Sequence, residues 1–168
     1  MSRVECKLIK KEDWLAVKEI WVDFSSSPYA RFDVPKVLDD ESVKNRIFSW
    51  AENQSKNAFF FGVWYEEKLV GYYSFIFRGE YWEVGYCFLS SSHRKGIAKE
   101  GMEKIKRFIS LYGKKIVART ALENVPSVRL LLSTGFVKTG EEEVSFYKDD
   151  KGYPIKFLGG IFTYEIKD

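Results

Sequence analysis

A short basic turn between an apolar strand-like run and an amphipathic helix is the feature that most constrains the fold of this chain. Residues 91–98 read SSHRKGIA. They follow an apolar run at residues 81–89 and open a helical pattern at residues 97–112. The first N–H groups of a helix lack intrahelical partners, and the helix dipole adds positive charge there. Gly96 has no Cβ, so the main chain can approach a ligand closely. The pattern predicts a phosphate-binding turn at a helix start.

The other patterns place this turn in a mixed α/β domain. Three β-rich runs joined by short turns predict an antiparallel meander, and amphipathic helical patterns stand before and after it. A strand that follows a helix can lie parallel to the strand before that helix through a right-handed crossover. The predicted strands are residues 4–9, 58–65, 69–77, 81–89, 115–122, 136–145 and 160–166, and the predicted helices are residues 11–24, 40–50, 97–112 and 126–133. We therefore expect a mixed, mostly antiparallel central sheet with helices on both sides.

Composition narrows the class of protein. The 168 residues are 45% hydrophobic and 17% aromatic, which suffices for one sizeable core, and no repeat or Pro/Gly-rich linker divides them. We expect one domain over residues 1–168. No apolar run approaches the ~20 residues of a membrane span, and residues 1–11 lack the apolar core of a signal peptide. Two cysteines and one histidine make a poor metal set and no disulfide framework. A cytoplasmic protein without a bound metal is the expectation.

Charge argues against a nucleic-acid partner. The net charge is only +3, and acidic runs at residues 39–41 and 141–143 interrupt any continuous basic face. Many aromatic side chains and a pI near 8.7 are the only features that favour a nucleic-acid-binding domain. We expect neither nucleic acid nor membrane as a partner.

A second motif follows the strand predicted at residues 115–122. Residues 123–136 read ENVPSVRLLLSTGF, which fits N-x-x-S-x-R-L-L-x-x-x-G-F. Asn124 offers an amide donor and acceptor at the strand end, and Ser127 can cap the helix or contact a ligand. An N-capped helix closed by Gly135 explains much of the same pattern, just as an ordinary strand-to-helix connection explains the turn. The turn is neither a P-loop nor a dinucleotide fingerprint, because the required glycines are missing.

Taken with residues 82–89, WEVGYCFL, the two motifs resemble the GNAT N-acetyltransferase superfamily, most closely its RimJ/RimL-type branch that acetylates ribosomal-protein N-termini. The resemblance covers residues 81–136 closely. It implies the GNAT fold, with a splayed pair of parallel strands, and acetyl-CoA as the cofactor. It also implies transfer of an acetyl group to a primary amine by direct attack.

The resemblance assigns roles to individual residues. The pyrophosphate of CoA would lie on the turn, and the pantetheine arm on backbone groups of Phe88 and Leu89. Asn124 would bind the pantetheine or lie near the thioester, with Ser127 beside it. The turn residues concerned are His93, Arg94, Lys95, Gly96, Ile97 and Ala98.

Two positions depart from the family pattern. His93 stands where the turn usually carries Gln or Arg, so Arg94 is the expected substitute. Leu131 stands where many members carry the tyrosine that protonates the departing thiolate. Ser127, or a tyrosine such as Tyr147, could donate to the thiolate through water.

Chemistry favours an α-amine as the acceptor. Deprotonating a lysine amine at pH 7 costs about 4.6 kcal/mol, whereas an α-amine costs about 1.4 kcal/mol. A weak or water-relayed base therefore suits an α-amine. Glu83 is the predicted base, because it lies on the strand that should flank the thioester, although a salt-bridged strand carboxylate is the plain alternative. Cys87 could form an acetyl-enzyme only with His93 as its partner, and a buried strand cysteine is the better interpretation.

The acceptor side should come from the first two helices, the loop between them and the late hairpin. The predicted substrate-binding side chains are Tyr29, Arg31, Phe32 and Trp82. Arg31 between two aromatics could bind a carboxylate-bearing acceptor or be a surface arginine. For Trp50 and Trp82, a place in the core is the better interpretation. Protein N-termini, antibiotics, polyamines and amino acids all remain open as acceptors, and so do monomer and homodimer. A catalytically weak acyl-CoA sensor is the alternative function, which Leu131 favours.

Overall fold

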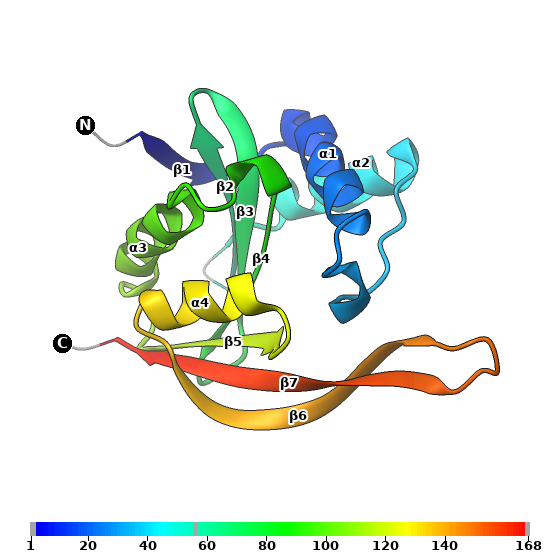
Figure 1. Cartoon of the computed structure of the whole chain (residues 1–168). Coiled ribbons are helices and arrows are strands. Elements are labelled where there is room, and N and C mark those ends of the chain that lie inside the picture. Colours follow the sequence, from blue (N-terminus) through cyan, green and yellow to red (C-terminus); the bar gives the residue numbers. More distant parts are fainter. Residues whose placement is uncertain (1–2, 56, 167–168) are drawn as a thin grey trace.

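The computed structural model describes residues 3–55 and 57–166, and it builds one seven-stranded sheet in the order β1-β2-β3-β4-β5-β7-β6 (Figure 1). The strands are β1 (Val4–Leu8), β2 (Ala58–Tyr65), β3 (Lys68–Phe77), β4 (Trp82–Phe88), β5 (Lys115–Ala121), β6 (Val137–Lys148) and β7 (Pro154–Glu165). The helices are α1 (Trp14–Ser25), α2 (Asp40–Glu52), α3 (Ile97–Ile109) and α4 (Val125–Ser133), with short 3-10 turns η1 (Lys11–Asp13), η2 (Ala30–Phe32) and η3 (Ser90–Ser92). The predicted order of helices and strands is confirmed.

Neighbouring strands pair antiparallel, except for β4 and β5, which pair in parallel. Helices cover both faces of the sheet. The side chains of Tyr72 and Tyr73 point to opposite faces of β3. Tyr72 accepts a hydrogen bond from Trp21 Nε1 of α1, and Tyr73 donates one to the Ala98 carbonyl of α3. The predicted fold class, a mostly antiparallel sheet between helices with one parallel strand pair, is confirmed.

The core lies on both faces of the central strands and is rich in aromatic side chains. Phe75 is fully buried on β3, with the rings of Phe61 and Tyr73 6.4 Å from its own. Trp82 is 1% exposed and packs against Phe59. The prediction that Trp82 binds the acceptor is therefore wrong, because its ring belongs to the core.

Local sequence explains most element boundaries. Asp39 caps α2 by accepting a hydrogen bond from Ser42 N at 2.9 Å, which holds the pKa of its carboxyl below the ordinary value. Helix α1 begins at Trp14 rather than at residue 11, because η1 precedes it. Strand β7 begins at Pro154, six residues earlier than predicted, and β6 ends at Lys148, three residues later than predicted. Their hairpin extends past the body of the sheet (Figure 1). Within the described residues, no helix is long and apolar enough to cross a membrane.

Candidate active site

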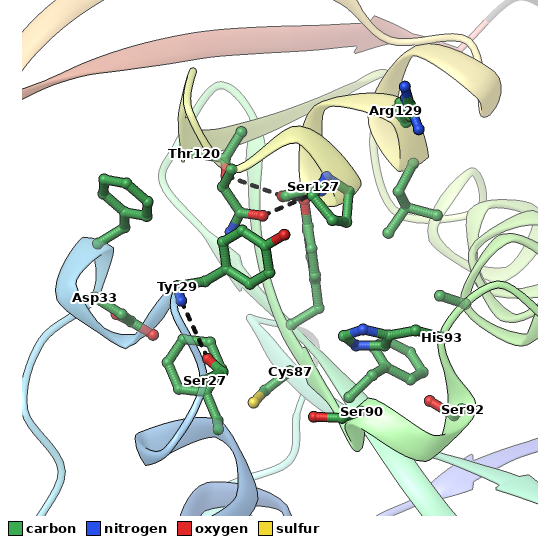
Figure 2. A pocket seen from close by; sticks show the side chains of 18 of the residues that line it. Ser27, Tyr29, Asp33, Cys87, Ser90, Ser92, His93, Thr120, Ser127 and Arg129 are labelled. Carbon is green, nitrogen blue, oxygen red and sulfur yellow. Dashed lines mark hydrogen bonds between the residues drawn. The ribbon is translucent and has the colours of Figure 1, made fainter.

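A cavity of about 610 Å³ opens where β4 and β5 separate. Four parts of the chain line it: the second half of β4, the turn from η3 into α3, the β5–α4 connection, and the loop that follows α1 (Figure 2). The cavity therefore brings together the two sequence motifs and the predicted acceptor loop, which are far apart along the chain.

Backbone groups of β4 face this gap. The register of β4 and β5 ends at Val84 and Ala118, although β4 continues to Phe88. Leu89 donates its N–H to Val70 O of β3 at 2.8 Å. Since strand amides alternate in direction, the N–H groups of Phe88 and Tyr86 point away from β3, into the gap. Phe88 is thus well placed to meet an extended ligand.

The backbone groups of Leu89 are already hydrogen-bonded within the protein and are not available to a ligand. Its N–H is bonded to Val70, and its carbonyl accepts both the N–H and the hydroxyl of Ser92, at 3.0 and 2.7 Å. The prediction that Leu89 offers backbone groups to a ligand is therefore wrong. Sequence reasoning missed this because η3 folds the chain back on itself immediately after the strand.

The turn into α3 forms the positive end of the cavity. Gly96 caps the helix with φ +75°, and Arg94 also has a positive φ of 63°. The first intrahelical bond runs from Glu100 N to Gly96 O, so the N–H groups of the three preceding residues have no acceptor within the helix. His93, Arg94, Gly96, Ile97 and Ala98, the residues of the predicted phosphate-binding turn, line the cavity.

Lys95 is the exception in the turn. It is not among the lining residues, and its carbonyl accepts a hydrogen bond from the Arg3 guanidinium. Lys99 and Arg129 line the cavity, although neither was predicted as a site residue. Lys99 lies one residue after the predicted motif on the first turn of α3, so its place in sequence was the available signal.

Ser127 lies at the centre of a hydroxyl cluster that joins β4, β5 and α4. Its Oγ is 2.5 Å from the Tyr86 hydroxyl and accepts a hydrogen bond from Thr120 Oγ1 at 2.9 Å. Its N–H donates to Asn124 Oδ1 at 3.4 Å, so Asn124 caps α4. Burial raises the pKa of Tyr86 to about 12, so its phenol stays protonated throughout the neutral range. Neither Tyr86 nor Thr120 was predicted, because only the folded register brings them to Ser127.

Glu83 lies outside the cavity lining. Its carboxylate forms ion pairs with Arg119 at 3.0 Å and with Arg78 at 3.4 Å. Arg119 does line the cavity, and its Nε also lies 3.4 Å from Glu142 of β6. Glu83 is thus a salt-bridged strand carboxylate at the edge of the site, which is the plain alternative considered above.

The loop after α1 forms the opposite wall. Tyr29 and Phe32 of this loop line the cavity. Asp33 of the loop and Asp23 near the end of α1, which were not predicted, line it with them. Arg31 does not line it: the side chain is 65% exposed and lies 3.9 Å from Glu123. Asp33 therefore places a carboxylate at this wall, whereas Asp23 accepts hydrogen bonds from the N–H and hydroxyl of Ser90 in η3.

The thiol of Cys87 lines the cavity but is not prepared for nucleophilic chemistry. Burial raises its pKa from 9.0 to about 12, and burial also raises that of Cys6 to about 11. The thiolate is the reactive form of cysteine. We expect both thiols of the native protein to react with a thiol reagent at pH 8 about tenfold or more slowly than in denaturant.

The measurement is the labelling rate with and without urea, followed by mass spectrometry. The same shift makes stability depend on pH: the Cys87 contribution is present below pH 9.0 and is lost as the pH rises toward about 12. Equal rates in the native and unfolded protein would contradict the assignment of Cys87 as a buried, unreactive thiol.

Comparison with known proteins gives a consistent result. A model described as acetyltransferase (GNAT) domain matches residues 3–137. The ribosomal-protein-S5-alanine acetyltransferase from Vibrio fischeri is 22% identical, with 100% of this chain and 96% of that chain covered at a TM-score of 0.81. RimL, a ribosomal L7/L12 alpha-N-protein acetyltransferase solved with coenzyme A, is 12% identical (99% and 96% covered, TM-score 0.83). The microcin C7 self-immunity acetyltransferase MccE, solved with acetyl-CoA and AMP, is 16% identical (99% and 94% covered, TM-score 0.81). No curated protein matches the sequence.

Proposed function

Because the chain belongs to the GNAT acetyltransferase family, we propose that it transfers an acetyl group from acetyl-CoA to the α-amine of a peptide or protein N-terminus. The observation that carries this proposal is the gap between β4 and β5, which opens into the same cavity as the unbonded amides of α3. We further propose a place in the RimJ/RimL-type branch, which the fold shared with two ribosomal-protein acetyltransferases supports.

The residues present fit coenzyme A. At one end of the cavity, Gly96 exposes the first amides of α3, and the side chains of Arg94 and Lys99 add positive charge suited to phosphate. His93, Arg129 and the turn residues Ile97 and Ala98 complete this end, while Lys95 would contribute only its charge from outside the lining. In the gap, the Phe88 amide can pair with an extended arm like a neighbouring strand, and Asn124 also lines the cavity.

Acetyl-CoA supplies an activated acyl group, and the chain's own residues position it. Ser127, on the first turn of α4, can donate a hydrogen bond to the departing sulfur in the positive field of the helix N-terminus. Glu83 is engaged with two guanidinium groups, so we assign it to holding β4 against β5 and leave the proton of the amine to water. An α-amine needs only about 1.4 kcal/mol for deprotonation at pH 7, which water can relay.

Tyr29 and Phe32, with Asp23 and Asp33, would form the acceptor wall. Carboxylates there would attract an ammonium group before it loses its proton. Arg31 would lie outside the pocket, at its rim. We further propose that residues 1–168 act as one cytoplasmic catalytic domain, as a monomer or homodimer.

The test is release of free thiol from acetyl-CoA by the purified protein with a panel of amines. Peptides with a free N-terminal Ser or Ala should react faster than the same peptides blocked at the N-terminus and carrying one lysine. Polyamines, an aminoglycoside and free amino acids complete the panel. Saturable binding of acetyl-CoA with no thiol release for any amine would overturn the proposal. That outcome would instead support an acyl-CoA sensor, as the fully buried Leu131 at the usual tyrosine position would allow.

A further inference from the structure

We propose that Tyr86 and Thr120 are positioning residues that make Ser127 an obligate hydrogen-bond donor to the thioester sulfur. This inference rests on the proposed function. It goes beyond the roles that the motifs imply. Tyr86 lies in the strand motif at residues 82–89 but was given no role, and Thr120 lies outside the motifs. Figure 2 shows Thr120 and Ser127 joined across the space between β5 and α4.

The three hydroxyl groups of Tyr86, Thr120 and Ser127 share a limited number of hydrogens. A hydroxyl group has one hydrogen to donate and can accept two hydrogen bonds. The geometry makes Thr120 the donor to Ser127 Oγ at 2.9 Å. Between Tyr86 and Ser127, at 2.5 Å, either oxygen could be the donor. The direction of this second bond decides where the Ser127 hydrogen points.

The phenol of Tyr86 settles that direction. Over residues 3–55 and 57–166, Ser127 Oγ is the one hydrogen-bond partner recorded for the Tyr86 hydroxyl. Tyr86 is half-buried at the cavity wall, and a donor left without an acceptor costs about 1–3 kcal/mol, so we assign its hydrogen to Ser127. Because the pKa of Tyr86 is raised to about 12, that hydrogen is present at any working pH. Ser127 Oγ then accepts two hydrogen bonds, and its own hydrogen is left for the cavity.

The groups that face the gap indicate which atom receives the Ser127 hydrogen. The Phe88 amide and the Tyr86 amide face the gap from β4 and suit the arm and the acetyl carbonyl. Ser127 faces the same gap from the first turn of α4 and is held there by its bond to Asn124. The acetyl oxygen and the sulfur both gain negative charge during transfer, and the β4 amides suit the oxygen, which leaves the sulfur for Ser127. The Ser127 hydrogen is therefore assigned to the sulfur.

The chemical step balances without a further reactant. The amine nitrogen forms a bond to the acetyl carbon, the carbon–sulfur bond breaks, and its electron pair stays on sulfur. The extra proton of the amine goes to water. Ser127 keeps its hydrogen and stabilises the thiolate through a hydrogen bond, and the thiolate later takes a proton from water. The two bonds that Ser127 accepts polarise its O–H and strengthen that donation.

The experiment compares Tyr86→Phe, Thr120→Val and Ser127→Ala with the unchanged protein. Tyr72→Phe is the matched control: Tyr72 is a neighbouring buried phenol on β3 that bonds Trp21 Nε1 on the other face of the sheet. We expect kcat to fall about 30-fold for Ser127→Ala and about tenfold for the other two, with KM for acetyl-CoA within about threefold. Thr120→Ser keeps the hydroxyl and should therefore keep kcat near that of the unchanged protein. Tyr72→Phe should lower stability without changing kcat.

A second readout does not depend on turnover. The thiol of bound CoA is titrated by the ultraviolet absorbance of its thiolate, and its pKa is compared with that of free CoA titrated in the same buffer. We expect a lower pKa in the unchanged protein and a return upward by about one unit in Tyr86→Phe and Thr120→Val. The charged groups around the cavity are the same in all these proteins: Asp23, Asp33, His93, Arg94, Lys99, Arg119 and Arg129.

The outcomes separate the two proposals. If the unchanged protein acetylates amines and Tyr86→Phe matches it in kcat and in thiol pKa, the hydroxyl cluster is only structural and this inference is wrong. If CoA binds but no amine is acetylated, the proposed function fails. The thiol titration then still decides whether Tyr86 and Thr120 direct Ser127 toward sulfur.

Discussion

Gly96→Val should weaken binding of coenzyme A about 100-fold while the protein remains folded. The backbone at this position has φ +75°, a conformation that a β-branched residue adopts only with strain. A Cβ here would also lie 3.3 Å from Arg3 Nη2, part of the guanidinium that holds the Lys95 carbonyl. Relief of that strain would turn the first amides of α3 away from the phosphates. Losing two hydrogen bonds to a charged group, at about 1.5 kcal/mol each, accounts for the factor.

Gly152→Val is the matched control for this change. Gly152 lies in the turn between β6 and β7 with φ +85°, and a Cβ there meets nothing within 4 Å. Both variants should lose a similar amount of stability in thermal unfolding, because both force valine into the left-handed region. Only Gly96→Val should lose affinity in a calorimetric titration with CoA. If its affinity equals that of Gly152→Val, the phosphate site lies elsewhere.

The largest loss of stability is expected from Phe75→Ala, at about 3–5 kcal/mol in the free energy of unfolding. Phe75 is fully buried on β3, and its ring contacts those of Phe61 and Tyr73. Removing the ring takes away its transfer free energy and leaves a cavity between strands that cannot collapse. Urea denaturation at neutral pH measures the change.

Phe77→Ala, two residues further along the same strand, is the comparison. Its side chain is 36% exposed and its ring lies 5.2 Å from that of Trp82, so we expect a loss of about 1 kcal/mol. Equal losses at the two positions would show that the core does not lie where the structure places it.

The order of the elements and the phosphate turn were predictable because they depend on local patterns. A glycine before a helix, a capping asparagine and apolar spacing all act within about ten residues. The start of β7 was missed because it follows directly on a turn-rich stretch and most of its first residues are exposed. Trp82 was named as an acceptor contact although the core was the better interpretation, because a large aromatic side chain suits a binding surface as well.

Other parts of the site depend on contacts that a single sequence does not encode in any short stretch. Tyr86 and Ser127 meet only because β4 and β5 pair in one register and then separate. Glu83 meets Arg119 for the same reason. Leu89 is lost as a ligand contact because one hydrogen bond to Val70 and a tight 3-10 turn use up its backbone groups.

The separation of β4 from β5 also limits how firmly the two parts of the sheet are connected. Only three residue pairs, from Trp82–Ile116 to Val84–Ala118, join the four strands of the N-terminal half-sheet to the three strands of the C-terminal one. The Tyr86–Ser127 hydrogen bond and the Glu83–Arg119 ion pair also connect these two parts of the sheet. An extended ligand lying in the gap would add contacts across this junction, so we expect bound ligand to hold the two parts of the sheet together more firmly.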